Sequence, residues 1–169
     1  MSDPVIDALN SGTEAEFVAR LGAVYEHSPW IAEAAWAKRP FRDRDDLARR
    51  MQDVLMQAPR AQQDQVIRAH PDLGGRLARA GVLTPHSRDE QASLGLDHLA
   101  SEDYDRLDQF NRDYAQKFGF PFIAALRDHS LGSLIDSMSR RVSNTPDEEH
   151  AAALFQIGRI AWYRINDLR

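Results

Sequence analysis

Residues 102–122 read EDYDRLDQFNRDYAQKFGFPF, and this stretch decides the fold class. Its first part, 102–118, is the longest clear amphipathic run in the chain, with apolar residues at helical spacing. Gly119 and Pro121 then break the helix, and a kinked apolar segment follows over 120–126. No segment shows the sustained alternation or the Val, Ile and Thr enrichment that is typical of strands. The sequence therefore predicts an all-α fold.

Helical signatures continue outward from this stretch toward both ends of the chain. Thr13 and Glu16 form a capping-box pattern that opens a helix to about Tyr25, and Ser28-Pro29 starts a second helix at Trp30. Apolar spacing and start signals predict further helices over 42–56, 61–69, 87–96, 130–142 and 145–168. Together these segments make about eight helices in a single compact domain, residues 1–169.

Composition and charge limit the classes of function. The chain has 169 residues, of which 43% are apolar and 28% charged, as in globular proteins with one sizeable core. Its formal net charge of −5 argues against nucleic-acid binding, which needs clustered positive charge. The absence of cysteine excludes disulfides and thiolate chemistry. No uncharged apolar run approaches about 20 residues and no secretory signal opens the chain, so we expect a cytoplasmic protein without a membrane partner.

His70 is the first candidate for chemistry. It lies where the helix over 61–69 ends against Pro71, and functional groups are often presented at the ends of elements. An imidazole with an ordinary pKa of about 6.5 suits proton transfer at neutral pH. For this residue alone a structural role is the simpler interpretation, because a histidine at a helix end also interacts with the last carbonyl groups.

Glu90 is the second candidate. Ser87-x-x-Glu90 has the spacing of a capping box, in which each side chain binds the other's backbone amide, and that alternative needs no catalytic role. Thr13/Glu16 and Thr145/Glu148 repeat the pattern elsewhere in the chain. Gln91 offers donors and an acceptor to a polar heterocycle if it faces a cleft. From spacing alone, the cap is the simpler reading of Glu90.

Other kinds of site find less support. The helical di-iron pattern needs two Glu-x-x-His copies, which the chain lacks, although five hard or borderline ligands lie close in sequence. These ligands are His70, Asp72, His86, Glu90 and His98. Schiff-base chemistry needs a lysine with a lowered pKa, whereas Lys117 at a helix end is more simply a solvated cap. Gly74-Gly75 lacks the spacing of a phosphate-binding loop, so we expect neither a metal nor a nucleotide cofactor.

The aromatic segment and two arginines offer binding groups. Phe118-Gly119-Phe120-Pro121-Phe122 reads most simply as core at a helix break. Irregular apolar backbone also lines small-molecule pockets, where free amide groups bind oxygens. On the last helix, Arg159 and Arg164 lie about 140° apart around the axis, so they do not both face one pocket. One of them is a candidate anchor for a substrate anion.

Five motifs occur in order along the chain, and together they resemble one family. The motifs are Glu26-His27-Ser28-Pro29-Trp30, His70-Pro71-Asp72-Leu73-Gly74-Gly75-Arg76, Ser87-x-x-Glu90-Gln91, Asn111-x-x-Tyr114-x-x-Lys117-Phe118-Gly119-Phe120-Pro121-Phe122 and Arg141-x-x-Asn144. From about residue 15 to 168 the chain resembles the 2-oxo-4-hydroxy-4-carboxy-5-ureidoimidazoline (OHCU) decarboxylases of urate catabolism. The combination is far more specific than any single motif.

The resemblance implies an all-helical fold and a reaction without metal or organic cofactor, in which the small-molecule substrate OHCU becomes (S)-allantoin and carbon dioxide. The family's catalytic histidine falls on His70, its glutamate on Glu90 and its arginine best on Arg164, with Arg159 as the alternative. The residues implied to contact the ligand are Pro71, Ser87, Arg88, Asp89, Glu90, Gln91, Phe122, Ile123, Ala124, Ala125 and Leu126. Many family members form homodimers, but nothing in this sequence specifies an interface.

Two alternatives stay open beside the enzyme. One is a helical protein-interaction module without catalytic activity, in which His70 and Glu90 are caps and the aromatic segment is core or a partner-binding patch. The other is a cofactor-free lyase that acts on a related ureido heterocycle. The enzyme hypothesis expects His70, Glu90 and the backbone of 122–126 to converge on one pocket, whereas a dispersed arrangement favours the module.

Overall fold

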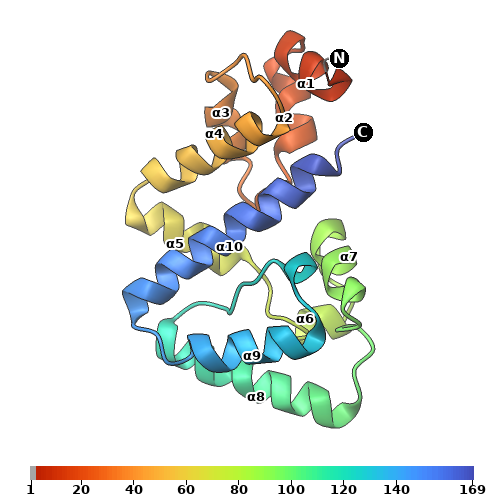
Figure 1. Cartoon of the computed structure of the whole chain (residues 1–169), viewed down its shortest axis with the longest axis vertical. Helices are drawn as coiled ribbons and strands as arrows, with labels where there is room; N and C mark the ends of the chain where they lie inside the picture. The colour runs from red at the N-terminus through yellow and green to blue at the C-terminus, as the bar shows by residue number, and fades with distance from the viewer. Residues whose placement is uncertain (1–2) are drawn as a thin grey trace. The chain divides into compact units, whose positions relative to one another are not determined.

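The computed structural model describes residues 3–169, and every regular element in that range is helical (Figure 1). The predicted all-α fold class is therefore confirmed. The α-helices are α1 (Pro4–Ser11), α2 (Glu14–Leu21), α3 (Trp30–Trp36), α4 (Arg44–Gln57), α5 (Arg60–Ala69), α6 (Arg76–Arg79), α7 (Pro85–Ser93), α8 (Ser101–Phe118), α9 (Leu131–Arg141) and α10 (Pro146–Asn166). A 3₁₀ turn, η1 (Leu126–Asp128), lies between α8 and α9. None of the helices formed by residues 3–169 combines the length and apolar character needed to cross a membrane.

All eight helices expected from the sequence are present, and α1 and α6 are additional. The Asp3 side chain caps α1 by accepting a hydrogen bond from the Val5 N–H at 2.9 Å, and Pro4 occupies the first helical position. An aspartate followed by proline is a recognisable start signal, because proline is pre-organised for the first turn. The four residues of α6 are too few for a periodic pattern to predict them.

The predicted start signals of α2 and α10 are confirmed in detail. The Thr13 and Glu16 side chains each accept a hydrogen bond from the other residue's backbone N–H. Thr145 and Glu148 do the same, at 2.8 and 3.3 Å. α2 ends at Leu21, earlier than predicted, and the chain then runs through turns to α3.

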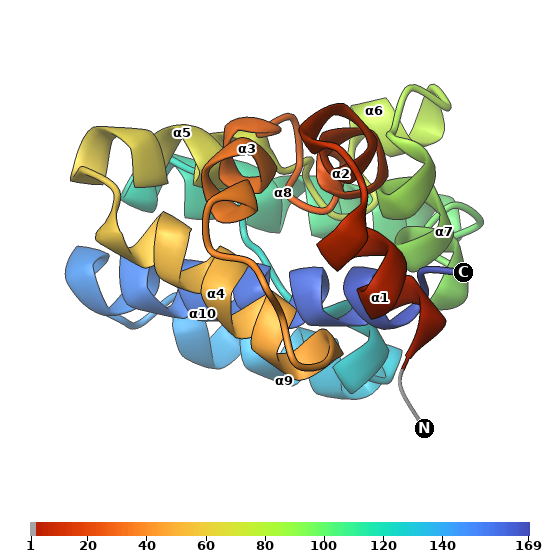
Figure 2. The same ribbon diagram turned by 90° about the horizontal axis from the view of Figure 1, so that it is seen from above.

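The chain divides into two compact units, of which the first contains residues 1–69 and 158–169. Within this unit α2 packs against α3, and α3 packs against α4 (Figure 2). The buried Phe17 side chain of α2 meets the Trp36 ring edge-on at 5.5 Å and stacks on Phe41 at 5.8 Å. The amphipathic faces of these three helices therefore build the core of the first unit.

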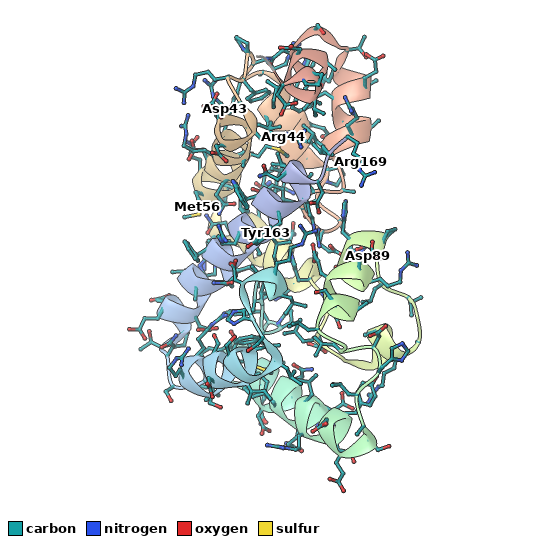
Figure 3. All side chains as sticks on the ribbon, turned by 45° about the vertical axis from the view of Figure 1, so that its right-hand side comes forward. Asp43, Arg44, Met56, Asp89, Tyr163 and Arg169 are labelled. Atoms are coloured by element: carbon teal, nitrogen blue, oxygen red, sulfur yellow. The ribbon has the colours of Figure 1, made fainter. Side chains whose placement is uncertain are left out.

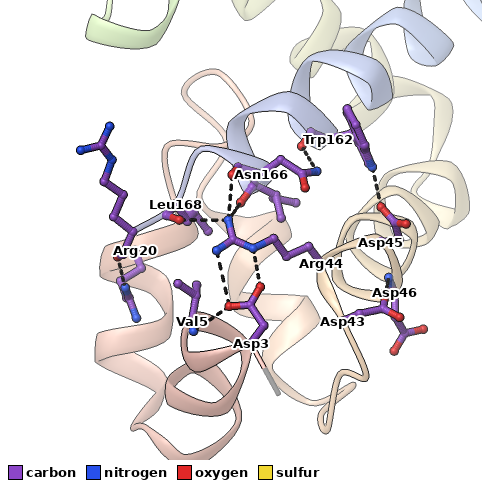
Figure 4. Close-up of polar contacts among 12 residues, drawn as sticks. Asp3, Val5, Arg20, Asp43, Arg44, Asp45, Asp46, Trp162, Asn166 and Leu168 are labelled. Carbon is purple, nitrogen blue, oxygen red and sulfur yellow. Dashed lines mark hydrogen bonds and ion pairs between the residues drawn. The ribbon is translucent and has the colours of Figure 1, made fainter. Parts of the chain in front are cut away.

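Arg44, the first residue of α4, fastens the end of the chain within the first unit (Figure 4). Its guanidinium donates to the carbonyl oxygens of Ile165, Asn166 and Leu168 at 2.8–2.9 Å. It also pairs with the Asp3 carboxylate at 2.6 Å. The last carbonyl groups of a helix have no partner inside that helix, so one arginine satisfies several of them together.

The second unit contains residues 70–157, and its core is rich in aromatic rings. Tyr114 of α8 lies 4.6–6.1 Å, between ring centroids, from Phe118, Phe120 and Phe122. Gly119 ends α8 with φ +78°, a left-handed conformation that glycine adopts without strain. The backbone then stays irregular until η1, so the predicted break after Phe118 is confirmed.

Candidate active site

His70 lies directly after α5, which ends at Ala69 as predicted. Pro71 explains the boundary, because a proline disfavours helical backbone at the residue before it. His70 is 7% exposed, so its imidazole is held in the interior and is not in bulk solvent.

The loop after His70 is fixed by amide side chains from two helices of the second unit. Gln91 of α7 donates to the Asp72 carbonyl at 3.1 Å and accepts from the Gly74 N–H at 2.8 Å. Asn111 of α8 donates to the Leu73 carbonyl at 3.0 Å. Gln91 thus uses its amide on backbone groups and ties this loop to α7. The prediction that Gln91 also contacts a ligand stays a prediction.

α7 begins earlier than the sequence predicts, and this changes the interpretation of Glu90. The N-cap is Thr84, whose hydroxyl accepts from the Ser87 N–H at 3.4 Å, and Pro85 occupies the first helical position. The predicted capping box of Ser87 and Glu90 is therefore wrong, because both residues lie inside the helix. Thr84-Pro85 is the stronger start signal, since it supplies a cap and a pre-organised backbone angle together.

The predicted ligand contacts on α7 divide between two faces of the helix. Ser87 and Gln91 are buried at 4% and 3% exposure, and Glu90 is half-buried on the same side. The Arg88 and Asp89 side chains are 60% and 79% exposed, and Asp89 is labelled on α7 in Figure 3. Any ligand contact by Arg88 or Asp89 on the buried side of the helix has to come from the backbone, and their role as contacts stays a prediction.

The segment Phe122–Leu126 forms a buried, irregular wall. All five residues are at most 5% exposed. The Ala125 N–H donates to Gln156 Oε1 at 2.9 Å, and the Ile123 carbonyl accepts from Arg141 Nη1 at 2.6 Å. Sequence reasoning missed both anchors, because they join residues 31 and 18 positions apart and no local spacing indicates them.

Within the second unit these parts lie together. α7 packs against η1, the turn that begins at Leu126 and continues the wall. The Gln91 amide joins α7 to the loop that His70 begins. The His70 loop and the turn that continues the wall therefore both contact α7, the helix that carries Glu90. Their convergence on one pocket stays a prediction.

Two groups in the second unit have raised pKa values. Burial raises the pKa of the Tyr114 hydroxyl, and its hydrogen bond to the Glu149 carboxylate raises it further. Tyr114 therefore stays a neutral donor at physiological pH. Partial burial raises the pKa of Asp72, and the negative charge of Asp108 adds to the effect.

The two candidate arginines belong to the first unit and have different surroundings. Arg164 is 1% exposed and donates through Nη1 to the Val24 carbonyl at 3.1 Å and to Glu26 Oε2 at 3.0 Å. Arg159 is half-buried and lies over the rings of Trp162 and Tyr163 at 5.2 and 5.0 Å. The two side chains thus take different partners, as their angular separation predicts. Which of them binds substrate stays a prediction.

The five potential metal ligands do not form a cluster. Among residues 3–169, no three His, Asp or Glu side chains lie close enough together to hold a metal ion. His98 illustrates the spread, since its side chain is 88% exposed beside Asp97.

A model of the OHCU decarboxylase family matches residues 10–166 of the chain. The chain belongs to the OHCU decarboxylase family. The resemblance noted in the sequence is therefore confirmed, and the match runs through both compact units. His70, Glu90 and Arg164, for which the resemblance implies catalytic roles, all lie inside the matched range.

Relatives in this family come from distant organisms. A protein of Halalkalicoccus jeotgali named 2-oxo-4-hydroxy-4-carboxy-5-ureidoimidazoline decarboxylase is 37% identical over 168 residues, 99% of this chain and 93% of the relative. A Mus musculus protein of the same name is 37% identical over 160 residues, 95% of this chain and 90% of the relative. The similarity thus extends over nearly the whole length of both relatives.

Two solved structures share the fold. The crystal structure of an (S)-allantoin synthase matches with a TM-score of 0.74 and 28% identity over 95% of this chain. The present chain spans about half, 52%, of that chain. A crystal structure of OHCU decarboxylase in the presence of (S)-allantoin has a TM-score of 0.69 at 20% identity, covering 93% of this chain and 98% of that one. At this identity the second match supports the fold alone.

Proposed function

We propose that this chain catalyses the cofactor-independent decarboxylation of OHCU to (S)-allantoin and carbon dioxide, the last step from urate to allantoin. One observation carries the proposal: Gln91 ties the loop after His70 to α7, the helix of Glu90, and α7 packs against the end of the Phe122–Leu126 wall. Family membership supports the reaction, and these contacts support the assignment of His70, Glu90 and the wall to one site.

The chemistry explains why so few residues suffice. Loss of carbon dioxide leaves an electron pair on carbon, and an enzyme without an organic electron sink needs a substrate that provides one. OHCU does so, because its ring has a carbon–nitrogen double bond beside the carboxylated carbon. The electron pair moves into the ring and one proton is added to a ring carbon. The protein has to orient the carboxylate, stabilise the moving charge and protonate one face.

The residues take separate roles in this scheme. His70 handles the proton, because an imidazole is a side chain that serves both as general base and as general acid. Glu90 orients His70 or binds the ureido N–H groups of the substrate. The capping alternative for Glu90 no longer competes with this role, since Thr84 caps α7. Arg164 binds an anionic or carbonyl oxygen of the substrate with its planar guanidinium.

The test follows OHCU by circular dichroism after it is made in place from urate by urate oxidase and hydroxyisourate hydrolase. With this protein, OHCU is expected to disappear faster than its spontaneous decay and to leave an allantoin signal of one sign. His70→Asn is expected to lose most of the turnover and to keep product binding near normal. His98→Asn is the matched control, because the His98 side chain is 88% exposed.

Glu90→Gln separates the roles of the carboxylate. Glutamine keeps the shape of the side chain but not its charge, so a folded and slow variant supports a charge-dependent role. OHCU decay at the spontaneous rate with racemic product would contradict the proposed function and favour the interaction module. Undiminished turnover by His70→Asn would contradict the assignment of His70 alone.

We further propose that the chain is a single domain, cytoplasmic and homodimeric. The family match across both units supports the single domain.

A groove of about 210 Å³ between α8 and α9 supports the dimer, since Leu131 and Ile135 beside it are 39% and 45% exposed. Asp103 and Arg106 also line this groove, and in a two-fold pair each is complementary to the other's copy. Native mass spectrometry decides the matter: twice the 19.1 kDa chain mass supports the dimer, and a monomer contradicts it.

A further inference from the structure

Ala124 has two buried backbone groups with no partner. It is 3% exposed, and among residues 3–169 neither its N–H nor its C=O takes part in a hydrogen bond. Buried backbone groups without a partner are rare in folded proteins, because each loses its bonds to water. The neighbours on both sides are held: Arg141 binds the Ile123 carbonyl and Gln156 binds the Ala125 N–H.

The two held neighbours fix the direction in which Ala124 faces. In a trans peptide the C=O of one residue and the N–H of the next point in opposite directions. The bond from Arg141 to the Ile123 carbonyl therefore directs the Ala124 N–H away from Arg141. The bond from the Ala125 N–H to Gln156 likewise directs the Ala124 C=O away from Gln156. Ala124 thus presents a donor that faces away from Arg141 and an acceptor that faces away from Gln156.

The anchor at Arg141 is itself held in place. Its Nε donates to the Glu149 carboxylate at 2.7 Å, and its Nη2 lies 2.5 Å from the same oxygen. Glu149 is fully buried and also accepts from the Tyr114 hydroxyl and, at 2.9 Å, from the Asn144 amide. A guanidinium whose Nε is hydrogen-bonded to a buried carboxylate has little freedom, so its Nη1 bond to the Ile123 carbonyl is well directed.

The two bonds that hold the neighbours of Ala124 both depend on residues on one face of α10. Glu149 and Gln156 are seven residues apart on this helix, which places them two turns apart on the same side. Glu149 acts on the wall through Arg141, and Gln156 acts on it directly. A rigid helix therefore sets the orientation of both peptide groups that flank Ala124.

We propose that Arg141 and Gln156 are positioning residues that hold the peptide groups on either side of Ala124, so that its N–H and C=O bind an amide edge of the substrate. The inference rests on the proposed function. OHCU carries N–H and C=O groups side by side in its ring and in its ureido arm, and such an edge matches an adjacent donor and acceptor. The pair also limits how the ring lies against the wall, and hence which face is protonated.

The test compares two substitutions of Gln156 that differ in the acceptor alone. Gln156→Met keeps the length and helix propensity of the side chain but removes the oxygen that binds the Ala125 N–H. Gln156→Glu keeps an oxygen acceptor in that place. Gln109→Met on α8 is the matched control, because Gln109 is exposed and bonds to neighbours on its own helix. The readouts are KM and kcat for OHCU, Kd for (S)-allantoin, and the enantiomer ratio after subtraction of spontaneous decay.

Gln156→Met is expected to raise KM and the Kd for (S)-allantoin about tenfold, which corresponds to about 1.4 kcal/mol, with a smaller change in kcat. It is also expected to lower the excess of the (S) product, which a purely structural loss of folded enzyme does not do. Gln156→Glu and Gln109→Met are expected to stay near the parent values. If Gln156→Met does not fold, Arg141→Lys takes its place, since lysine keeps the charge beside Glu149 but lacks the second arm that reaches Ile123.

Two results would overturn the inference. Parent-like KM and Kd in the folded Gln156→Met or Arg141→Lys variant would show that the anchors do not act on the substrate. Equal impairment by Gln156→Glu and Gln156→Met would show that the acceptor is not what matters. Failure of the proposed function is distinguishable, because the unmodified protein would then fail to accelerate OHCU loss.

Discussion

Asp46 in the first unit and Glu149 in the second are both carboxylates with 0% side-chain exposure, and both are paired with arginine. Their partners differ. Asp46 is surrounded by Arg42, Arg49 and Arg50, whose side chains are 74%, 58% and 32% exposed. Arg141, the partner of Glu149, is 13% exposed and also holds the Ile123 carbonyl.

The difference lies in what each carboxylate organises. The arginines around Asp46 lie within four residues of it, so the cluster acts at the start of α4 and, through the bond from Arg50 to the Lys38 carbonyl, on the loop just before that helix. The partners of Glu149 come from α8, from the end of α9 and from the loop before α10. Glu149 therefore holds separate elements together. Its partner Arg141 also binds the Ile123 carbonyl and so connects this arrangement to the wall. The same ion pair chemistry serves local stability in one unit and a candidate site in the other.

The largest expected effect is that of Glu149→Ala. Removal of the carboxylate leaves the Arg141 guanidinium without its charge partner in a largely buried site, which typically destabilises a protein by about 3–5 kcal/mol. Urea unfolding measures this loss. Glu148→Ala is the matched control, because the exposed Glu148 caps the same helix and its removal is expected to do much less. Equal losses in the two variants would mean that the buried pair organises nothing.

The second effect is the pH dependence that comes from Asp46. Burial opposes its ionisation, but the Arg42 amide and the Arg50 and Arg49 side chains outweigh burial and lower the pKa from 3.8 to about 2. A carboxyl whose pKa is lower in the folded state stabilises above the unfolded pKa, and this contribution is lost as the pH falls from about 4 to about 2. The pKa difference corresponds to at most about 2.5 kcal/mol. The gap in unfolding free energy between the parent and Asp46→Asn should shrink over this range. A constant gap would contradict the role of the charge.

A third effect tests how much of the Glu149 arrangement depends on its neutral donors. Tyr114→Phe removes one hydroxyl from the carboxylate but leaves Arg141 and Asn144 in place. A hydrogen bond to a charged group contributes about 1.5 kcal/mol or somewhat more, so the loss should be well below that of Glu149→Ala. Tyr104→Phe on the same helix is the control, since Tyr104 is only half-buried there. A loss as large as that of Glu149→Ala would place the hydroxyl, and not the arginine, at the centre of the arrangement.

This contrast also shows what the sequence reveals. The helices, the break after Phe118 and the capping boxes at Thr13 and Thr145 depend on residues a few positions apart, and local patterns predict them. The position of His70 was predictable for the same reason. The spacing of Ser87 and Glu90 predicts a helix start that the structure does not have, because Thr84-Pro85 competes for the same start and local rules rank such competitors poorly.

The support for the wall was not predictable in this way. Arg141 and Asn144 stand out in the sequence as part of a family motif, but their partner Glu149 and its role toward Ile123 do not. Gln156 has no motif, and its contact with the Ala125 N–H spans 31 residues of irregular and helical chain. Contacts of this kind arise only when the tertiary packing sets one helix face beside one loop.

The smallest expected effect completes the comparison. Arg49→Ala removes one of three arginines from Asp46, and the arginine is 58% exposed, so the unfolding free energy should fall by no more than about 0.5 kcal/mol. Arg141→Ala removes the single arginine on Glu149 and should approach the loss of Glu149→Ala. Urea unfolding of both variants under one buffer condition makes the ratio of the two losses the measured quantity. A ratio near one would mean that neither the exposure of an arginine nor the number of arginines around the carboxylate decides its contribution to the unfolding free energy. The distinction between the local cluster at Asp46 and the organising pair at Glu149 would then fail.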